Sequence, residues 1–147
     1  MTGKSIRFLI VAGEASGDMH GSGLVRALKK IHPNCEFSGL GGNSMRKEGV
    51  KTFFDIDRMG TIGVVELLGD LSHYLNVYYK LASEIKSGRY DAVILIDYPT
   101  LNIRLAGLCH KHSCPSLFFI SPQVWAWRKG RIKKIRRTVD KMFVIFP

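Results

Sequence analysis

The stretch Ala92-Val-Ile-Leu-Ile96 is aliphatic throughout, and an acid, Asp97, follows it directly. A strand that is apolar on both faces has to be covered on both faces, as the strands of parallel sheets are. Similar apolar runs recur along the chain, and segments with helical periodicity separate them. This alternation predicts an α/β fold with a Rossmann-like, doubly wound parallel sheet.

The expected strands span residues 7–12, 36–40, 50–55, 92–96, 116–120 and 141–146, and the expected helices span 18–31, 44–48, 63–86, 101–111 and 131–139. Within the long third helix, residues 63–86, apolar residues recur every three or four positions, which predicts one inward stripe. The stripe consists of Val64, Leu68, Leu71, Leu75, Tyr78, Ala82 and Ile85.

At 147 residues, with 46% hydrophobic and 23% charged residues, the chain has the size and composition of one folded domain. Its cysteines form no CxxC pair and its histidines show no metal-ligand spacing. We therefore expect a reducing compartment, no metal and no cofactor. No signal-peptide pattern and no run of membrane-spanning length is present, which predicts a soluble or peripheral protein.

The net charge of +10 is concentrated in one segment. Residues 128–141 hold eight of the 22 lysines and arginines and a single acid, Asp140. The helix expected there would bury Ile132, Ile135 and Val139 and turn its charges outward. A phosphate, an anionic membrane or a nucleic acid would suit such a surface, although no nucleic-acid-binding motif accompanies it.

Ligands of doubly wound sheets bind beyond the carboxyl ends of the strands, which directs attention to loops 13–18, 41–44, 97–102 and 121–128. The first loop is rich in glycine, and such a turn can bring backbone N–H groups up to a ligand. It matches neither the dinucleotide fingerprint nor the P-loop, and its acid, Glu14, suits a sugar hydroxyl better than a pyrophosphate. The alternative is a tight turn capped by Ser16 or Asp18.

Asp97 leaves the aliphatic strand at the carboxyl edge of the sheet, and Pro99 fixes the turn that follows. A carboxylate at such an edge is desolvated on one side, which favours use as a general base. The alternative is that Asp97 caps the next helix. Asn102, at the start of that helix, is expected to be a cap or a hydrogen-bonding partner.

Two further stretches combine apolar side chains with charge. Residues 121–128 contain both tryptophans, Trp125 and Trp127, which predicts an aromatic wall for a sugar ring or an acyl chain. The alternative is one tryptophan in the core and the other at a helix cap.

Residues 62–68 are more apolar than one stripe requires, which predicts a patch for acyl chains or a membrane, with a wide core face as the alternative. Glu66 within them is either a helix N-terminal charge or a site residue.

Five stretches, in their order and spacing, resemble the lipid-A-disaccharide synthase family, bacterial glycosyltransferases with the two-domain GT-B architecture. They are Ala12-Gly-Glu-Ala-Ser-Gly-Asp18, Gly39-Leu-Gly-Gly42, Met59 to Leu68, Ile96-Asp-Tyr-Pro99 with Asn102, and Ser121-Pro-Gln-Val-Trp-Ala-Trp-Arg128 with Arg131. One departure is Thr100-Leu101, where the family pattern has Asp-Phe. The resemblance implies that residues 1–147 are a single Rossmann-like, acceptor-side domain, the N-terminal half of a GT-B fold, with the nucleotide-binding C-terminal domain absent from this chain.

The resemblance further implies an inverting transfer of 2,3-diacylglucosamine from its UDP derivative to 2,3-diacylglucosamine 1-phosphate, which gives lipid A disaccharide 1-phosphate and UDP. Asp97 takes the place of the general base, and no metal is implied. The expected substrate contacts are Gly13, Glu14, Ser16, Gly17, Glu66, Asn102, Ser121, Gln123, Trp125, Arg128 and Arg131. The expected acyl or membrane contacts are Ile62, Val65, Leu67 and Leu68.

The same resemblance implies a cytoplasmic protein that is peripheral at the inner face of the inner membrane of a Gram-negative bacterium. Its partners would be the two acylated substrates, an anionic membrane surface and the missing C-terminal domain, but no nucleic acid. The isolated chain is expected to be inactive or weakly active. Two alternatives are another GT-B sugar-nucleotide enzyme, such as a UDP-sugar 2-epimerase, and a non-enzymatic basic module that binds nucleic acid or membrane.

Overall fold

The structure, a computed structural model, describes residues 3–56, 67–120 and 129–143, without the side chains of residues 67–70, 129 and 131. In this part of the chain, six strands form one sheet: β1 (Ile6–Ala12), β2 (Cys35–Gly41), β3 (Lys51–Asp55), β4 (Ala92–Ile96), β5 (Ser116–Phe119) and β6 (Lys141–Phe143). All neighbouring strands run parallel, in the order β3-β2-β1-β4-β5-β6. The predicted parallel sheet is confirmed.

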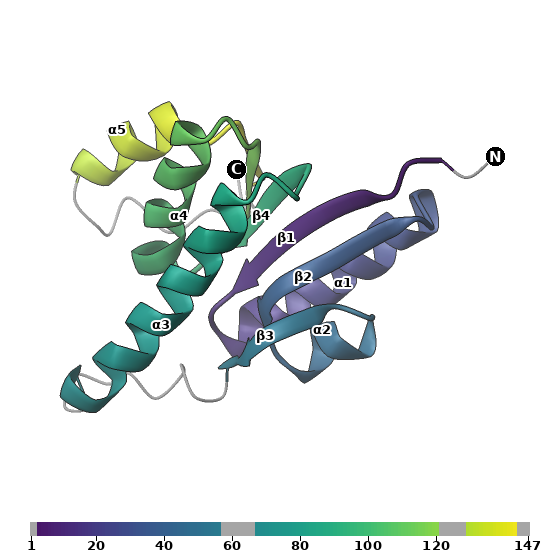
Figure 1. Ribbon diagram of the computed structural model, residues 1–147, viewed down its shortest axis with the longest axis horizontal. Helices are drawn as coiled ribbons and strands as arrows, with labels where there is room; N and C mark the ends of the chain where they lie inside the picture. The colour runs from purple at the N-terminus through teal and green to yellow at the C-terminus, as the bar shows by residue number, and fades with distance from the viewer. Residues whose placement is uncertain (1–2, 57–66, 121–128, 144–147) are drawn as a thin grey trace.

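The described helices are α1 (Ala15–Ile31), α2 (Asn43–Lys47), α3 (Leu67–Lys86), α4 (Pro99–Lys111) and α5 (Lys129–Thr138). Helices α1 and α2 cover one face of the sheet, and α3, α4 and α5 lie on the other (Figure 1). The fold is therefore doubly wound, as predicted. α4 begins at Pro99, two residues earlier than predicted, because proline fits the first turn of a helix, where its missing N–H has no partner to lose.

The core consists of two layers that share the central strands. Because side chains of a strand alternate between its faces, Leu9 and Val11 pack with α3 and α4, while Ile10 and Ala12 pack with α1. The aliphatic strand β4 is buried at every position, which confirms the prediction that both of its faces are covered.

The predicted inward stripe of α3 is wrong over the first described turns of that helix. Leu71 and Leu75 are 49% and 36% exposed, whereas Leu81 and Ile85 are buried. The start of α3 projects beyond the ends of the strands in Figure 1, so periodicity there continues without a sheet to pack against. Among the described residues, no helix has the length and apolar character needed to cross a bilayer.

The prediction for the basic helix α5 is also corrected in part. Ile135 is buried and Val139 is half-buried against the same core cluster, but Ile132 is 44% exposed. α5 has only ten residues and lies outside α4, so a narrow part of its surface meets the core (Figure 1). The basic residues of this helix whose side chains are described, Lys133, Lys134, Arg136 and Arg137, are all exposed.

Candidate functional site

The glycine-rich loop after β1 and the Asp97 loop after β4 leave neighbouring strands at the same register position. Ala12, the last residue of β1, pairs with Ile96, the last residue of β4. The next residues, Gly13 and Asp97, therefore emerge together, about 5 Å apart in the direction across the strands. Here the strand order reverses from 3-2-1 to 4-5-6, and such a switch point is where open α/β sheets bind ligands.

Asp97 lies in a turn with unusual backbone geometry. Asp97 and Tyr98 have φ of 46° and 45°, in the left-handed region that residues other than glycine rarely adopt. Such a conformation costs about 1–2 kcal/mol per residue and persists where neighbouring contacts hold it. Asp97 is half-buried, and its carboxylate makes no hydrogen bond or ion pair with any described residue. The alternative role as a helix cap is wrong, since α4 has Tyr98 at its N-cap and no side-chain capping bond.

Asn102 stabilises this turn through hydrogen bonds to its backbone. Its side chain is fully buried, and its Nδ2 donates to the backbone carbonyls of Ile96 and Asp97 at 3.1 and 2.7 Å. Its backbone N donates to the carbonyl of Tyr98 at 3.1 Å. The expected hydrogen-bonding role is thus confirmed, and direct contact of Asn102 with a substrate stays a prediction. Its Oδ1 has no hydrogen-bond partner among the described residues.

The glycine-rich loop contains buried residues that pack against the sheet and exposed residues that a ligand could reach. Gly13 and Gly17 are buried, and a Cβ at Gly17 would already lie 3.3 Å from that of Ala12, so this glycine allows α1 to approach the sheet. Glu14 and Ser16 are exposed beside Gly13. Their side chains and that of Asp97 are among the polar groups that these two loops present to solvent at the switch point.

The suggested cap of α1 by Ser16 or Asp18 is wrong. α1 has Glu14 at its N-cap without a side-chain capping bond. Asp18 is instead buried against the start of α2, where Oδ1 accepts from the backbone N of Gly42 and Met45 at 2.8 and 3.0 Å. Oδ2 accepts from the backbone N of Ser44 at 3.0 Å. Asp18, in the first turn of α1, therefore caps a different helix and ties α1 to the β2–α2 loop.

Tyr98 lies at the candidate site, and the sequence analysis did not predict it. Its ring lies directly over Gly13, where a Cβ would come within 2.6 Å of ring atoms Cγ and Cδ1. Burial first, and then the nearby Tyr74 hydroxyl and Glu14 carboxylate, raise the pKa of Tyr98. The only sequence signal was its place between the acid and Pro99, and a residue before proline is usually extended rather than left-handed.

Many of the predicted contacts lie outside the described residues. This applies to Glu66, Ser121, Gln123, Trp125, Arg128, Ile62 and Val65, and to the side chains of Leu67 and Leu68 in α3 and Arg131 in α5. Of the predicted residues, the structure brings together Gly13, Glu14, Ser16, Gly17, Asp97 and Asn102.

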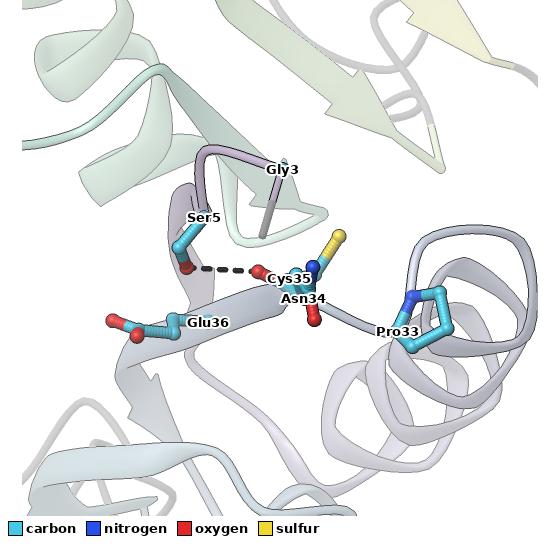
Figure 2. A pocket seen from close by; sticks show the side chains of 6 residues that line it. All are labelled: Gly3, Ser5, Pro33, Asn34, Cys35 and Glu36. Atoms are coloured by element: carbon cyan, nitrogen blue, oxygen red, sulfur yellow. Dashed lines mark hydrogen bonds between the residues drawn. The ribbon is translucent and has the colours of Figure 1, made fainter. Parts of the chain in front are cut away.

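The opposite edge of the sheet carries a separate hollow of about 360 Å³ at the amino ends of β1 and β2. Figure 2 shows its lining, in which Ser5 Oγ donates to the carbonyl of Asn34 at 2.8 Å. No unpartnered buried polar group lies among its lining residues. No group of three or more histidine, cysteine or acidic side chains suited to a metal ion occurs in the described part of the chain.

The strand order defines a Rossmann-like α/β protein, and the polar switch-point loops form a candidate ligand site at the carboxyl edge of its sheet. A family model described as lipid-A-disaccharide synthetase matches residues 8–147. The chain belongs to this family.

Individual relatives agree with the family model. The chain is 48% identical to the lipid-A-disaccharide synthase of Geobacter sulfurreducens over 143 residues, which is 97% of this chain and 37% of the relative. It is 45% identical to that of Geobacter metallireducens over 146 residues, and 40% identical to that of Coxiella burnetii over 146 residues. Each of these alignments covers 99% of this chain and 38% of the relative. The chain thus spans little more than a third of the relatives it matches.

Proposed function

We propose that this chain is the acceptor-side, N-terminal domain of an inverting GT-B glycosyltransferase. The whole protein would transfer 2,3-diacylglucosamine from its UDP derivative to 2,3-diacylglucosamine 1-phosphate, and release UDP and lipid A disaccharide 1-phosphate. Membership of the lipid-A-disaccharide synthetase family supports the reaction class. The observation that carries the proposal is the carboxylate of Asp97, which makes no hydrogen bond or ion pair with any described residue and lies beside Gly13 at the switch point of the sheet.

In this proposal, Asp97 is the general base. The 6-hydroxyl of the acceptor attacks the anomeric carbon of the donor sugar from the face opposite UDP. As the new C–O bond forms, Asp97 takes the proton of the hydroxyl, and the bond between the sugar and UDP breaks with UDP as the leaving group. Attack from the opposite face inverts the anomeric configuration. The exposed Glu14 and Ser16 would bind sugar hydroxyls, because both side chains can accept hydrogen bonds from them.

Two described surfaces suit acylated, anionic substrates. The outer part of α3 exposes Leu71, Leu75 and Tyr79, and α5 carries exposed lysines and arginines. An apolar helix face and a basic helix together favour binding to a membrane that contains anionic lipid. We therefore place the protein in the cytoplasm, peripheral at the inner membrane of a Gram-negative cell. The part of the relatives' length that this chain does not span would bind the nucleotide.

The test is a transfer assay on Asp97→Asn in a fusion of this chain with the C-terminal portion of the Geobacter sulfurreducens relative. Asparagine has nearly the same shape and tolerates the left-handed backbone, so the turn should keep its geometry. Loss of a general base should lower kcat by roughly 10²–10⁴-fold with little change in KM for the acceptor.

Asp91→Asn is the matched control, since Asp91 is an exposed aspartate that accepts from the backbone N of Arg7 at the amino edge of the sheet. It should retain full activity. An Asp97→Asn enzyme within a few-fold of the parent kcat would contradict the assignment of the base.

A further inference from the structure

We propose that Tyr98 is a positioning residue: its ring, seated on Gly13, sets the spacing between the glycine-rich loop and the turn that carries Asp97. The inference rests on the proposed function only in naming Asp97 as the base. The contact itself is a property of the two loops.

The ring and the glycine fit each other closely. A Cβ added at Gly13 would lie 2.6 Å from Cγ and Cδ1 of Tyr98 and 3.0 Å from Cδ2. Three atoms on one side of the ring therefore lie over the loop backbone, and only glycine leaves room for them. Any larger residue at position 13 would have to displace the ring.

Displacement of the ring would move the backbone of the turn. Tyr98 and Asp97 are both left-handed, with φ of 45° and 46°, in a region that allows little freedom to a residue with a Cβ. Asn102 also stabilises the turn. Its Nδ2 donates to the Asp97 carbonyl at 2.7 Å, and its backbone N donates to the Tyr98 carbonyl at 3.1 Å. Because the ring is fixed against Gly13 and the turn is fixed by Asn102, the position of Asp97 is fixed as well.

Tyr98 also connects a third segment to the site. Its half-buried ring packs against the core cluster that includes α3 and α4. The hydroxyl is close enough to Tyr74 of α3 and to Glu14 for both to influence its ionisation, and burial, followed by these two neighbours, raises the pKa of Tyr98. Tyr98 thus packs against the core cluster and the glycine-rich loop, and it lies near enough to Tyr74 of α3 for the two hydroxyls to interact electrostatically.

This connection matters for the chemistry of Asp97. A general base has to reach within hydrogen-bond distance of the proton it removes, and displacements of about 1 Å can lower rates by 10²-fold. A sugar bound at Glu14 or Ser16 would be placed by the same loop that places the ring. Substrate and base would therefore be positioned relative to each other by one contact.

The experiment is a double-mutant cycle on this chain without substrate, using Gly13→Ala, Tyr98→Asn and the double variant. Asparagine is chosen because it tolerates the left-handed conformation but has no ring. With the ring present, Gly13→Ala should lower Tm by roughly 5 °C. In the Tyr98→Asn background, the same substitution should lower Tm by about 1 °C or less.

The second measurement is the ¹³C resonance of the Asp97 carboxyl at fixed pH. It should shift in Gly13→Ala and in Tyr98→Asn, and Gly13→Ala should add no further shift in the Tyr98→Asn background.

Gly23→Ala is the matched control, because a Cβ at Gly23 would meet nothing within 4 Å. It should leave the Asp97 resonance unchanged. An Asp97 resonance that stays constant in Gly13→Ala and Tyr98→Asn, while Tm falls, would show that the ring only fills space and would overturn the proposal. An equal cost of Gly13→Ala with and without the ring would overturn it as well. Because no substrate is used, these outcomes are independent of the reaction proposed above, which fails separately if Asp97→Asn keeps its activity.

Discussion

At the residue scale, the end of α3 holds a buried carboxylate that accepts several hydrogen bonds. Glu84 is 3% exposed and accepts from Lys80, Arg89 and the hydroxyl of Tyr90 at 2.9, 2.8 and 2.7 Å. Burial alone would raise the pKa of Glu84, but these hydrogen bonds and charges together hold it below its usual value. The cluster stabilises the junction between α3 and β4, away from the candidate site.

This cluster predicts a loss of stability in alkaline solution. Burial, the hydrogen bond to Glu84 and its charge raise the pKa of Tyr90 from 10 to about 12. The folded protein therefore keeps the Tyr90 proton to a higher pH than the unfolded chain does. This contribution is fully present below pH 10 and is lost as the pH rises from 10 towards 12. We expect a decrease of about 2 kcal/mol in the free energy of unfolding, measured in urea, after allowance for solvent screening.

Tyr90→Phe should remove this alkaline decrease, because it has no proton to lose. Tyr79→Phe is the control, since the Tyr79 side chain is 64% exposed, and it should keep the decrease. If Tyr90→Phe and the parent lost stability equally between pH 10 and 12, the raised pKa of Tyr90 would be refuted.

Sequence patterns located some site residues and not others, for a physical reason. Asp97 could be placed at the carboxyl edge because it directly follows an aliphatic strand, and the structure places it there. The role of Asp18 could not be predicted, because its partners Gly42 and Met45 lie 24 and 27 residues away in the sequence. The left-handed turn at Tyr98 opposes the usual preference of a residue before proline, so no local rule could indicate it.

At the element scale, α3 illustrates the limit of periodicity. Its apolar spacing continues over the whole helix, but only the part that crosses the sheet is buried. A pattern records which face is apolar, whereas burial depends on whether another element covers that face. The exposed outer part is consistent with the role in acyl or membrane binding proposed above.

The double variant Leu71→Ser/Leu75→Ser tests this division of α3. Because both side chains are already 49% and 36% exposed, we expect a change of only about 1 kcal/mol or less in unfolding free energy. Leu81→Ala, at a fully buried position, should cost about 3 kcal/mol. In co-sedimentation with vesicles that contain anionic phospholipid, the double variant should bind several-fold less.

Ile31→Ser is the control for the vesicle measurement. Ile31 is 69% exposed at the end of α1, which covers the other face of the sheet. It should bind vesicles as the parent does. Equal loss of binding in both variants would mean that exposed apolar residues act nonspecifically, and no loss in either would remove α3 from the membrane contact.

At the scale of the whole molecule, the fold could be predicted further than the site. Alternating apolar strands and amphipathic helices restrict the chain to a doubly wound parallel sheet, whereas the strand order is known from the structure alone. The site depends on contacts between loops that are distant in sequence, such as Tyr98 with Gly13, which no periodic pattern encodes. The central claim is that these loops belong to an acceptor-side domain, which makes ligand preference the decisive property.

The most direct measurement is a calorimetric titration of this chain with detergent-solubilised 2,3-diacylglucosamine 1-phosphate, and in parallel with UDP. The account predicts saturable binding of the acylated acceptor, no measurable binding of UDP, and weaker acceptor binding in Gly13→Ala than in Gly23→Ala. Tight binding of UDP with none of the acceptor would contradict it, because the chain would then be the nucleotide-binding side of the enzyme.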